Sequence, residues 1–342
     1  IIYTSGSTAT PKGVVSCHRQ VVFVARAIQS RLGYRADDVV FCALPLSFDY
    51  GLYQVYLCVL AGACLVLADE SDSGATLVAT LNRCQATVLP LVAPMAATLV
   101  ALVARTSRAP AALRLITSSG ASLDDALARG LRTLLPNAVL VGMFGLTECK
   151  RVTVGEPQEL IAFPGSCGRA LPDTEIYVID DRGNRLPPGE VGELVVRGPH
   201  VMSGYWGDPL LTAARFPRDE LGEARLRTGD QCRIDADGRL YFVGRADDIY
   251  KQRGFRVSIL EVEAAALRVP GVRAAAALPP ENGGGAVLVV EGDLTPIALR
   301  VGMSQHIEDL TIPEECHVLR ALPVGPNGKI DKRGLRTMLA AS

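Results

Sequence analysis

Between residues 14 and 145 the sequence alternates regularly between helix-like and strand-like apolar segments. Three segments carry apolar side chains at helical spacing: 20–33, which Gly33 closes, 76–85 and 124–136. Four short apolar runs are typical of strands buried on both faces of a sheet: 38–47, 86–91, 113–119 and 138–145. Strands that alternate with helices predict a layered α/β fold with parallel strands.

The sequence changes character after about residue 165, where turn residues become frequent. Residues 174–198 indicate short strands broken by Arg-Gly-Asn and Pro-Pro-Gly, and residues 232–244 indicate a hairpin closed by Asp-Gly. A helical pattern at 259–272 then opens a smaller α+β segment. We therefore expect a large domain over residues 1–246, with a layered α/β part and a β-rich part, and a smaller α+β domain over residues 247–342.

The composition narrows the classes of partner and compartment. Lys and Arg number 35 against 36 Asp and Glu, so no basic surface for nucleic acid or anionic membrane is expected. The apolar run at 55–68 is too short to span a bilayer, and prolines at 90 and 94 make the run at 88–104 a strand followed by a helix. Nine scattered cysteines without a Cys-x-x-Cys pair favour a reducing compartment. We expect a cytoplasmic protein that binds neither nucleic acid nor membrane.

The stretch YTSGSTATPKG, residues 3–13, crowds small hydroxyl and glycine residues around Lys12. Hydroxyls and exposed backbone N–H groups converge on oxyanions, so this loop predicts phosphate binding. It is not a Walker A loop, because Gly13 rather than Ser or Thr follows the lysine. The alternative is a Ser/Thr-rich surface turn.

Four further motifs follow in order: MFGLTE at 143–148, LRTGD at 226–230, GRADDIYKQRGFR at 244–256 and PNGKID at 326–331. Together with the loop at 3–13 they resemble the ATP-dependent adenylate-forming (AMP-binding) enzymes. That superfamily includes acyl-CoA synthetases, luciferases, adenylation domains of nonribosomal peptide synthetases and free-standing ligases that load amino acids onto carrier proteins. The resemblance covers essentially the whole chain, but the sequence starts without the segment that usually precedes the Ser/Thr/Gly loop. Either the sequence is a fragment, or another chain supplies that segment as a partner.

The resemblance implies a role in ATP binding for residues of four of these motifs and for the stretch at 119–121. The β- and γ-phosphates would be held by Thr4, Ser5, Gly6, Ser7, Thr8 and Lys12. Adenine would pack along Ser119, Gly120 and Ala121, with Phe144 stacking on it, and Gly145 is a further implied ATP-binding position. Thr147 would contact the α-phosphate and Glu148 would help to hold Mg²⁺. The ribose hydroxyls would contact Asp230 and Arg245.

Several of these residues also have an ordinary structural interpretation. Phe144 alone is typical of a core residue, Thr147 and Glu148 of a helix start, and Asp230 with Arg227 of a solvated pair at a strand end. Ala9 stands where the family usually has Gly, and it would be strained if that position needs a positive φ.

The smaller domain carries three implied positions. Lys329 matches the lysine that bridges the substrate carboxylate and the α-phosphate, although Asn327-Gly328 by itself predicts only a turn. Asp247 matches the hinge about which the mobile small domain turns between two half-reactions. Gly254 would then face the incoming pantetheine thiol.

The stretch LPLSFDYGLY, residues 44–53, falls where the family binds the acid. Asp49 matches the aspartate that pairs with the ammonium of amino-acid substrates, although an Asp capping a turn before Gly51 is the alternative. The rest of the expected acid-binding set is Tyr50, Tyr53, Ile116, Ser118, Met143, Arg151 and Val152. Two tyrosines suggest a small or flat substrate, and Arg151 would point inward, pair with Asp49 or reach solvent.

The sequence therefore predicts an enzyme that uses ATP and Mg²⁺ to activate an amino acid as an acyl-adenylate and passes it to the phosphopantetheine thiol of a carrier protein. The stretches FDYGLY and GLTECKR resemble those of free-standing ligases that load amino acids, proline among them, onto carrier proteins. Two alternatives stay open: an acyl- or aryl-CoA synthetase, which uses free CoA, and a non-catalytic remnant that binds nucleotide or a carrier protein. Asp49 separates the first two, because a carboxylic acid without an amine does not need it.

Overall fold

The computed structural model describes residues 1–4, 11–69, 72, 74–119, 123, 125–157, 159–220, 222–245, 249–252, 255–281, 285–324 and 330–340. The chain divides into two compact units. The first consists of Ile1–Thr228 and Cys232–Phe242, and the second of Gly229–Gln231 and Val243–Ser342.

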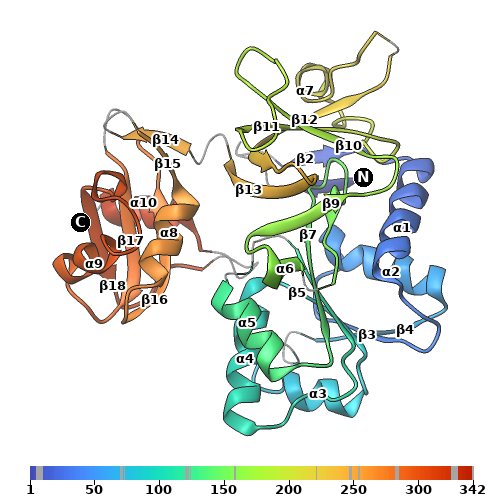
Figure 1. Cartoon of the computed structure of the whole chain (residues 1–342), viewed down its shortest axis with the longest axis horizontal. Coiled ribbons are helices and arrows are strands. Elements are labelled where there is room, and N and C mark those ends of the chain that lie inside the picture. Colours follow the sequence, from blue (N-terminus) through green and yellow to red (C-terminus); the bar gives the residue numbers. More distant parts are fainter. Residues whose placement is uncertain are drawn as a thin grey trace. The chain divides into compact units, whose positions relative to one another are not determined.

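The first unit is built on an eleven-stranded sheet whose order is β10-β11-β12-β13-β9-β8-β7-β6-β5-β3-β4 (Figure 1). Its five strands at one end run parallel: β4 (Cys64–Leu67), β3 (Val39–Cys42), β5 (Val88–Leu91), β6 (Leu115–Ser118) and β7 (Val139–Phe144). All residues of β5 and β6 are buried, which is why their sequences are apolar without alternation.

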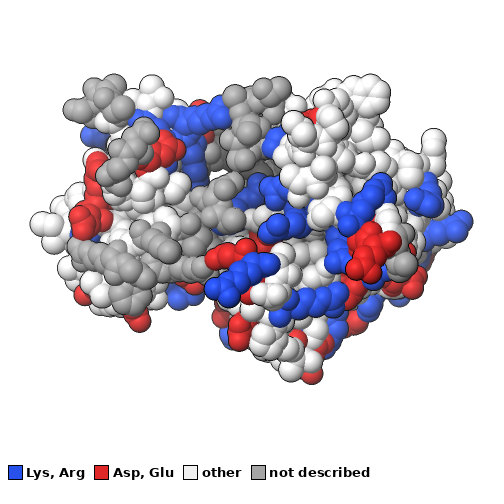
Figure 2. All heavy atoms as spheres, turned by 90° about the horizontal axis from the view of Figure 1, so that it is seen from above, with Lys and Arg blue, Asp and Glu red and all other residues white. Residues whose placement is uncertain are grey.

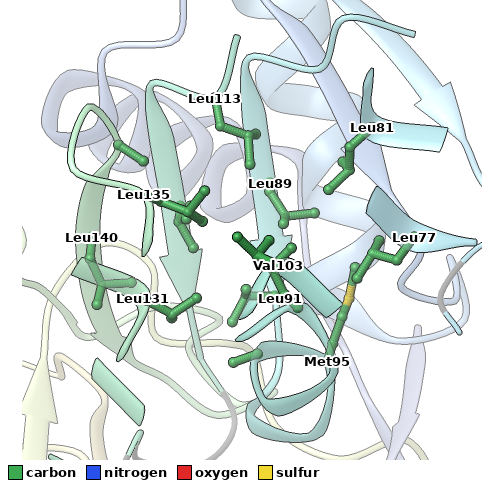
Figure 3. Packing of buried hydrophobic residues seen from close by; sticks show 14 of the residues in the cluster. Leu77, Leu81, Leu89, Leu91, Met95, Val103, Leu113, Leu131, Leu135 and Leu140 are labelled. Atoms are coloured by element: carbon green, nitrogen blue, oxygen red, sulfur yellow. The ribbon is translucent and has the colours of Figure 1, made fainter. Parts of the chain in front are cut away.

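Helices cover both faces of the parallel strands. Side chains of α1 (His18–Leu32) and α2 (Asp49–Ala61) share a core cluster with Val40, Val88 and Val141. Side chains of α3 (Leu77–Arg83), α4 (Ala93–Thr106) and α5 (Asp125–Leu134) share another with Phe41 and Leu89 (Figure 3). Because neighbouring residues of one strand enter different clusters, the two clusters lie on opposite faces of the sheet. The predicted α/β fold class is confirmed.

Two local predictions are also confirmed. Helix α1 ends where expected, with Gly33 in the left-handed conformation at φ 59°. The apolar run at 88–104 is strand β5 followed by α4, whose Pro94 lies in the first turn, where a missing N–H is tolerated.

The β-rich part combines the hairpin of β1 (Ile2–Thr4) and β2 (Lys12–Val14) with the elements that follow β7. These are β8 (Thr153–Val154), α6 (Glu159–Ala162), β9 (Ser166–Ala170), β10 (Glu175–Ile179), β11 (Val191–Arg197), α7 (Pro209–Arg215), β12 (Arg225–Ile234) and β13 (Arg239–Arg245). Gly229–Gln231 of β12 and the end of β13 from Val243 onward are counted with the second unit. Strands β12 and β13 form the expected hairpin, in which the N–H of Gly238 donates to the carbonyl of Asp235.

The second unit has a three-stranded sheet in the order β16 (Val272–Leu278), β17 (Val287–Gly292), β18 (Glu315–Leu319). Helices α8 (Ile259–Leu267) and α9 (Pro296–Met303) share a core with Ala275 and Ala277, whereas α10 (Lys332–Ala340) packs with Ala276. The hairpin of β14 (Ile249–Gln252) and β15 (Phe255–Ser258) and the short η3 (Asp309–Thr311) complete it. Strands and helices are mixed here, as an α+β unit requires.

Basic and acidic side chains are interspersed on the face drawn in Figure 2, in keeping with a formal net charge of −1. Among the described residues, none of the helices combines the length and the apolar character needed to cross a bilayer.

Candidate active site

Strands β1 and β2 pair directly on either side of the predicted phosphate loop. Thr4 lies opposite Lys12 in the antiparallel register, so the two described ends of the loop are held together. The Lys12 ammonium lies 6.0 Å from the centre of the Tyr205 ring, at the outer range of a cation–π contact. The loop residues Ser5, Gly6, Ser7, Thr8 and Ala9 lie outside the described residues.

Tyr205 connects Lys12 to the predicted magnesium ligand. Its hydroxyl donates to Glu148 Oε1 at 2.7 Å, and the backbone of Met202 donates to the Glu148 carbonyl at 2.9 Å. Thr147 and Glu148 lie in a turn after β7, not in a helix. The predicted phosphate-binding lysine and the predicted metal-binding carboxylate therefore contact one tyrosine, which lies outside all of the sequence motifs.

Glu148 is compatible with magnesium binding of one particular kind. No group of three or more His, Cys, Asp and Glu side chains within the described ranges could hold a metal on its own. Magnesium, however, is commonly bound through one or two carboxylates together with substrate phosphates. A single half-buried carboxylate, whose partner Tyr205 also lies against the predicted phosphate-binding Lys12, fits that pattern.

The turn after β7 packs closely on itself. A Cβ atom at Gly145 would lie 2.2 Å from the Lys150 carbonyl oxygen and 2.9 Å from the Arg151 Cα atom. The Lys150 N–H donates to the Leu146 carbonyl, and Lys150 adopts a left-handed φ of 63°, which non-glycine residues rarely do. The absent side chain of Gly145 thus allows the backbone to place Lys150 and Arg151 inside the unit.

Lys150, Arg151 and Asp49 form a buried group that we call the charged cluster. Asp49 is the first residue of α2, where a carboxylate is favoured by the helix dipole. Its Oδ2 atom lies 3.9 Å from Lys150 Nζ, and the two side chains are 11% and 2% exposed. The turn-cap interpretation of Asp49 is therefore replaced by a helix-start position beside a buried cation.

Of the three orientations considered for Arg151, the structure shows the inward one. Its guanidinium donates to the hydroxyl of Ser119 and lies 5.2 Å from the centre of the Tyr50 ring. The Tyr50 hydroxyl in turn lies 2.7 Å from Thr117 Oγ1. Among the described residues, Lys150 and not Arg151 is the cation within 4.0 Å of Asp49.

Burial shifts the protonation equilibria of the cluster. Desolvation lowers the pKa of Lys150, and the nearby Asp49 carboxylate opposes that shift. Desolvation also lowers the pKa of Arg151, which is opposed first by Tyr50 and then by Asp49. Burial raises the pKa of the Tyr50 and Tyr53 hydroxyls, so both stay neutral. A nearby negative charge therefore stabilises the charged forms of both Lys150 and Arg151.

The apolar and aromatic members of the predicted acid-binding set are divided among three core clusters. Tyr50, Tyr53 and Met143 share the core cluster of α1 and α2. Ile116 packs with the side chains of α3–α5, on the opposite face of the sheet, and Val152 packs in the β-rich part. The hydroxyl of Ser118 is buried without a hydrogen-bond partner among the described residues. Thr117, which bonds to Tyr50, lies on the face where Ile116 was expected.

Phe144 is half-buried at the end of β7. Its ring lies 5.6 Å from that of Phe242 at an interplanar angle of 31°. Ser119 is buried against Arg151, whereas Gly120 and Ala121 lie outside the described residues.

In the second unit, Asp230 and Arg245 are directly bonded. Arg245 Nε donates to Asp230 Oδ1 at 3.1 Å, and Asp230 is only 5% exposed. Arg227 instead pairs with Glu193, so the solvated Arg227–Asp230 pair is not what forms. Lys329, Asp247 and Gly254 lie outside the described residues.

Comparison with known proteins gives one family and several solved relatives. The AMP-binding enzyme family matches residues 1–206. A 4-coumarate–CoA ligase of Pinus taeda is 31% identical over 99% of this chain, and the chain spans 65% of that relative's length. The structure of VinN with L-aspartate is 44% identical over 71% of this chain and 59% of its own, with a TM-score of 0.64. O-succinylbenzoate CoA synthetase from Bacillus subtilis, with ATP and magnesium, is 29% identical over 98% of this chain and 69% of its own, with a TM-score of 0.86.

Proposed function

Because the chain belongs to the AMP-binding enzyme family, we propose that it activates the carboxylate of an amino acid with ATP and transfers the acyl group to a phosphopantetheine thiol of a carrier protein. The observation that carries the proposal is Asp49, a buried carboxylate in the first turn of α2. A buried carboxylate is costly unless a cation faces it, and a substrate ammonium is such a cation.

The first half-reaction joins the acid to AMP. A carboxylate oxygen of the acid attacks the α-phosphorus of ATP, the bond from that phosphorus to the bridging oxygen breaks, and pyrophosphate leaves with the electron pair. Such a displacement depends on positioning and charge neutralisation more than on covalent help. Lys12 would neutralise the departing phosphates, and the Thr147 hydroxyl would donate to the α-phosphate.

Glu148 would hold magnesium, which when bound neutralises phosphate charge. The Tyr205 hydroxyl bonds to one carboxylate oxygen of Glu148 and thereby restricts the orientation of that carboxylate. The O-succinylbenzoate CoA synthetase with ATP and magnesium supports the choice of both ligands. Asp230 and Arg245 would contact the ribose hydroxyls, and Lys329 would bridge the acid and the α-phosphate.

Two observations favour an amino acid as the substrate. Asp49 is the buried anion that the acyl- and aryl-CoA synthetase alternative does not require. VinN, at 44% identity, has been solved with L-aspartate. The Asp49 carboxylate would accept hydrogen bonds from the substrate ammonium and so discriminate against acids without an amine.

The second half-reaction transfers the acyl group. The sulfur of the thiol attacks the acyl carbon, AMP leaves with the bonding electrons, and the thiol proton is lost to solvent. Rotation of the smaller domain about Asp247 would precede this step, with Gly254 beside the thiol. A second candidate acceptor is free CoA, which the similarity to a 4-coumarate–CoA ligase favours.

Acid-dependent exchange of labelled pyrophosphate into ATP tests the first half-reaction. The panel contains the twenty standard amino acids and a set of aryl and short fatty acids, with Lys329→Ala as the inactive control. We expect exchange with one amino acid or a small group of them, strongly reduced in the control. Exchange only with acids that lack an amine would overturn the assignment to amino acids and favour the CoA synthetase.

The acceptor is tested separately with the acid that gives exchange. Thioester formation is measured by mass spectrometry with a phosphopantetheinylated carrier protein and with CoA at equal concentrations. We expect faster thioester formation on the carrier protein. Faster transfer to CoA would replace the carrier protein by CoA without affecting the first half-reaction.

A further inference from the structure

We propose that the amino acid is an amino dicarboxylic acid, whose second carboxylate binds between Lys150 and Arg151 while its ammonium binds Asp49. The proposal rests on the proposed function for the identity of the site and for the role of Asp49, and it adds roles for Lys150 and Arg151, to which that function assigns none.

The charges of the cluster do not balance. Asp49 supplies one negative charge, whereas Lys150 and Arg151 supply two positive charges, and all three residues are buried. Glu148 is close along the chain, but its Oε1 atom accepts the hydrogen bond of Tyr205. Buried cations are stable only when they are paired with anions. One more negative charge would make the cluster neutral.

Lys150 provides the strongest observation. Its Nζ atom is buried and makes no hydrogen bond with any group that the structure describes. The distance of 3.9 Å to Asp49 is too long for a hydrogen bond. An ammonium group has three donors, and an unpaired one deep in a protein carries a desolvation cost that an arriving carboxylate would offset.

The backbone holds this lysine inward. A lysine normally extends its ammonium into water, but the left-handed turn at Lys150 and the contact between Gly145 and the Lys150 carbonyl fix its direction. Rare backbone conformations cost free energy and are maintained where the surroundings require them, which is frequent at ligand sites. The inward position of Lys150 is therefore a property of the fold.

Arg151 has donor capacity to spare. One terminal nitrogen donates to Ser119, and its Nε atom is buried without a hydrogen-bond partner among the described residues. The planar guanidinium matches a carboxylate in geometry, and the Tyr50 ring restrains it. Lys150 and Arg151 together offer the point charge and the planar fork that carboxylate recognition uses.

The substrate's own charges decide between two arrangements. If Lys150 only neutralises Asp49, a substrate ammonium would meet an anion that is already paired, and Arg151 would stay unbalanced. If the substrate brings an ammonium and a second carboxylate, Asp49 pairs with the ammonium and the two cations pair with the carboxylate. The second arrangement accounts for all three side chains. The reactive carboxylate remains free for ATP.

The test measures binding by calorimetry in the absence of ATP, so that it does not depend on catalysis. The ligands are L-aspartate, L-glutamate, L-asparagine, L-glutamine and the α-amides of aspartate and glutamate, which neutralise one carboxylate at a time. Lys150→Met removes the ammonium while keeping a flexible apolar stem, and Lys150→Arg keeps the charge. Arg83→Met removes a positive charge from an exposed position on α3 and serves as the matched control.

We expect one dicarboxylate to bind at least about 10-fold more tightly than the amide that neutralises the carboxylate at Lys150, because charged hydrogen bonds are lost in the amide. Lys150→Met should remove most of that preference and leave amide binding within about 3-fold. Lys150→Arg should keep part of it, and Arg83→Met all of it. Thermal melts of each variant show that it is folded.

Equal affinity for the dicarboxylates and both of their amides would overturn the inference. So would a preference that persists in folded Lys150→Met. Pyrophosphate exchange separates this failure from failure of the proposed function. Exchange with neutral amino acids alone would leave the adenylating function intact and remove the dicarboxylate. Selective binding of a dicarboxylate without exchange would support the inference and remove the function.

Discussion

The ammonium of Lys150 lies 3.9 Å from a carboxylate oxygen of Asp49, with both side chains buried in the first unit. The two residues come from different elements, because Asp49 opens α2 whereas Lys150 follows the end of β7. Their distance is short enough for strong attraction in a buried setting but too long for a hydrogen bond. The pair therefore leaves both groups able to bind further partners, which is what an amino acid with an additional negative charge would supply.

Gly145→Ala should disturb both cations of the charged cluster. The new Cβ atom would meet the Lys150 carbonyl oxygen, which is backbone and cannot rotate away. We expect a loss of about 1–3 kcal/mol in the free energy of unfolding, as for other overpacked positions. The affinity for the acid should fall as well, since Lys150 and Arg151 must move. Urea unfolding and calorimetry measure the two effects.

Gly74→Ala is the control for that substitution. A Cβ atom at Gly74 meets no atom within 4 Å, so its unfolding free energy and acid affinity should match those of the parent protein. If both glycine variants behave alike, the close approach at Gly145 does not position the cluster.

Tyr205→Phe should weaken magnesium dependence through Glu148. The substitution removes the hydroxyl that donates to Glu148 Oε1 but keeps the ring beside Lys12. Removing a group that hydrogen-bonds to a metal ligand typically lowers metal affinity or activity by about 10-fold or more. We expect the magnesium concentration at half-maximal exchange to rise by about that factor. Glu148→Gln should need a still higher magnesium concentration, and the double variant should need no more magnesium than Glu148→Gln alone. Additive effects would mean that Tyr205 acts independently of Glu148.

His200 should make the fold sensitive to acid. Burial lowers the pKa of His200 to about 4, its ring stacks on Phe23, and both ring nitrogens lack a hydrogen-bond partner among the described residues. The unfolded chain binds the proton near pH 6.5 and the folded chain only near pH 4, so stability falls as the pH drops between these values. The loss in the free energy of unfolding that is due to His200 reaches about 3 kcal/mol near pH 4.

The measurement is the free energy of unfolding between pH 4 and pH 7 for the parent protein and His200→Leu. Other titrating groups are common to both, so the difference isolates the histidine. We expect the leucine variant to lose less stability on acidification. Parallel pH profiles for the two proteins would contradict a neutral, buried His200.

The family and the α/β fold could be predicted from the sequence for a clear physical reason. Parallel strands such as β5 are buried on both faces and read as unbroken apolar runs, and α1 carries its stop signal in Gly33. The motif order indicated the AMP-binding enzymes, which the family match confirms. These signals are local, so they can be recognised in the sequence without knowledge of the tertiary structure.

The charged cluster could be predicted only in part. Asp49 and Arg151 were singled out, but Lys150 resembles an ordinary solvated lysine, and nothing in the letters ECKR announces a left-handed backbone at that position. Ile116 shows the complementary difficulty. In a strand buried on both faces the apolar pattern does not say which side faces α2, and the structure places Thr117 there.

Asp49→Asn tests the central claim most directly. The measurement is pyrophosphate exchange supported by the amino acid that gives the highest rate and, in parallel, by the same acid without its amine. Removing one partner of a buried charge pair costs a large part of the binding free energy, so exchange with the amino acid should fall about 100-fold or more. Exchange with the amine-free acid should change little or improve. Equal loss with both acids, or no loss with the amino acid, would contradict the pairing of Asp49 with a substrate ammonium.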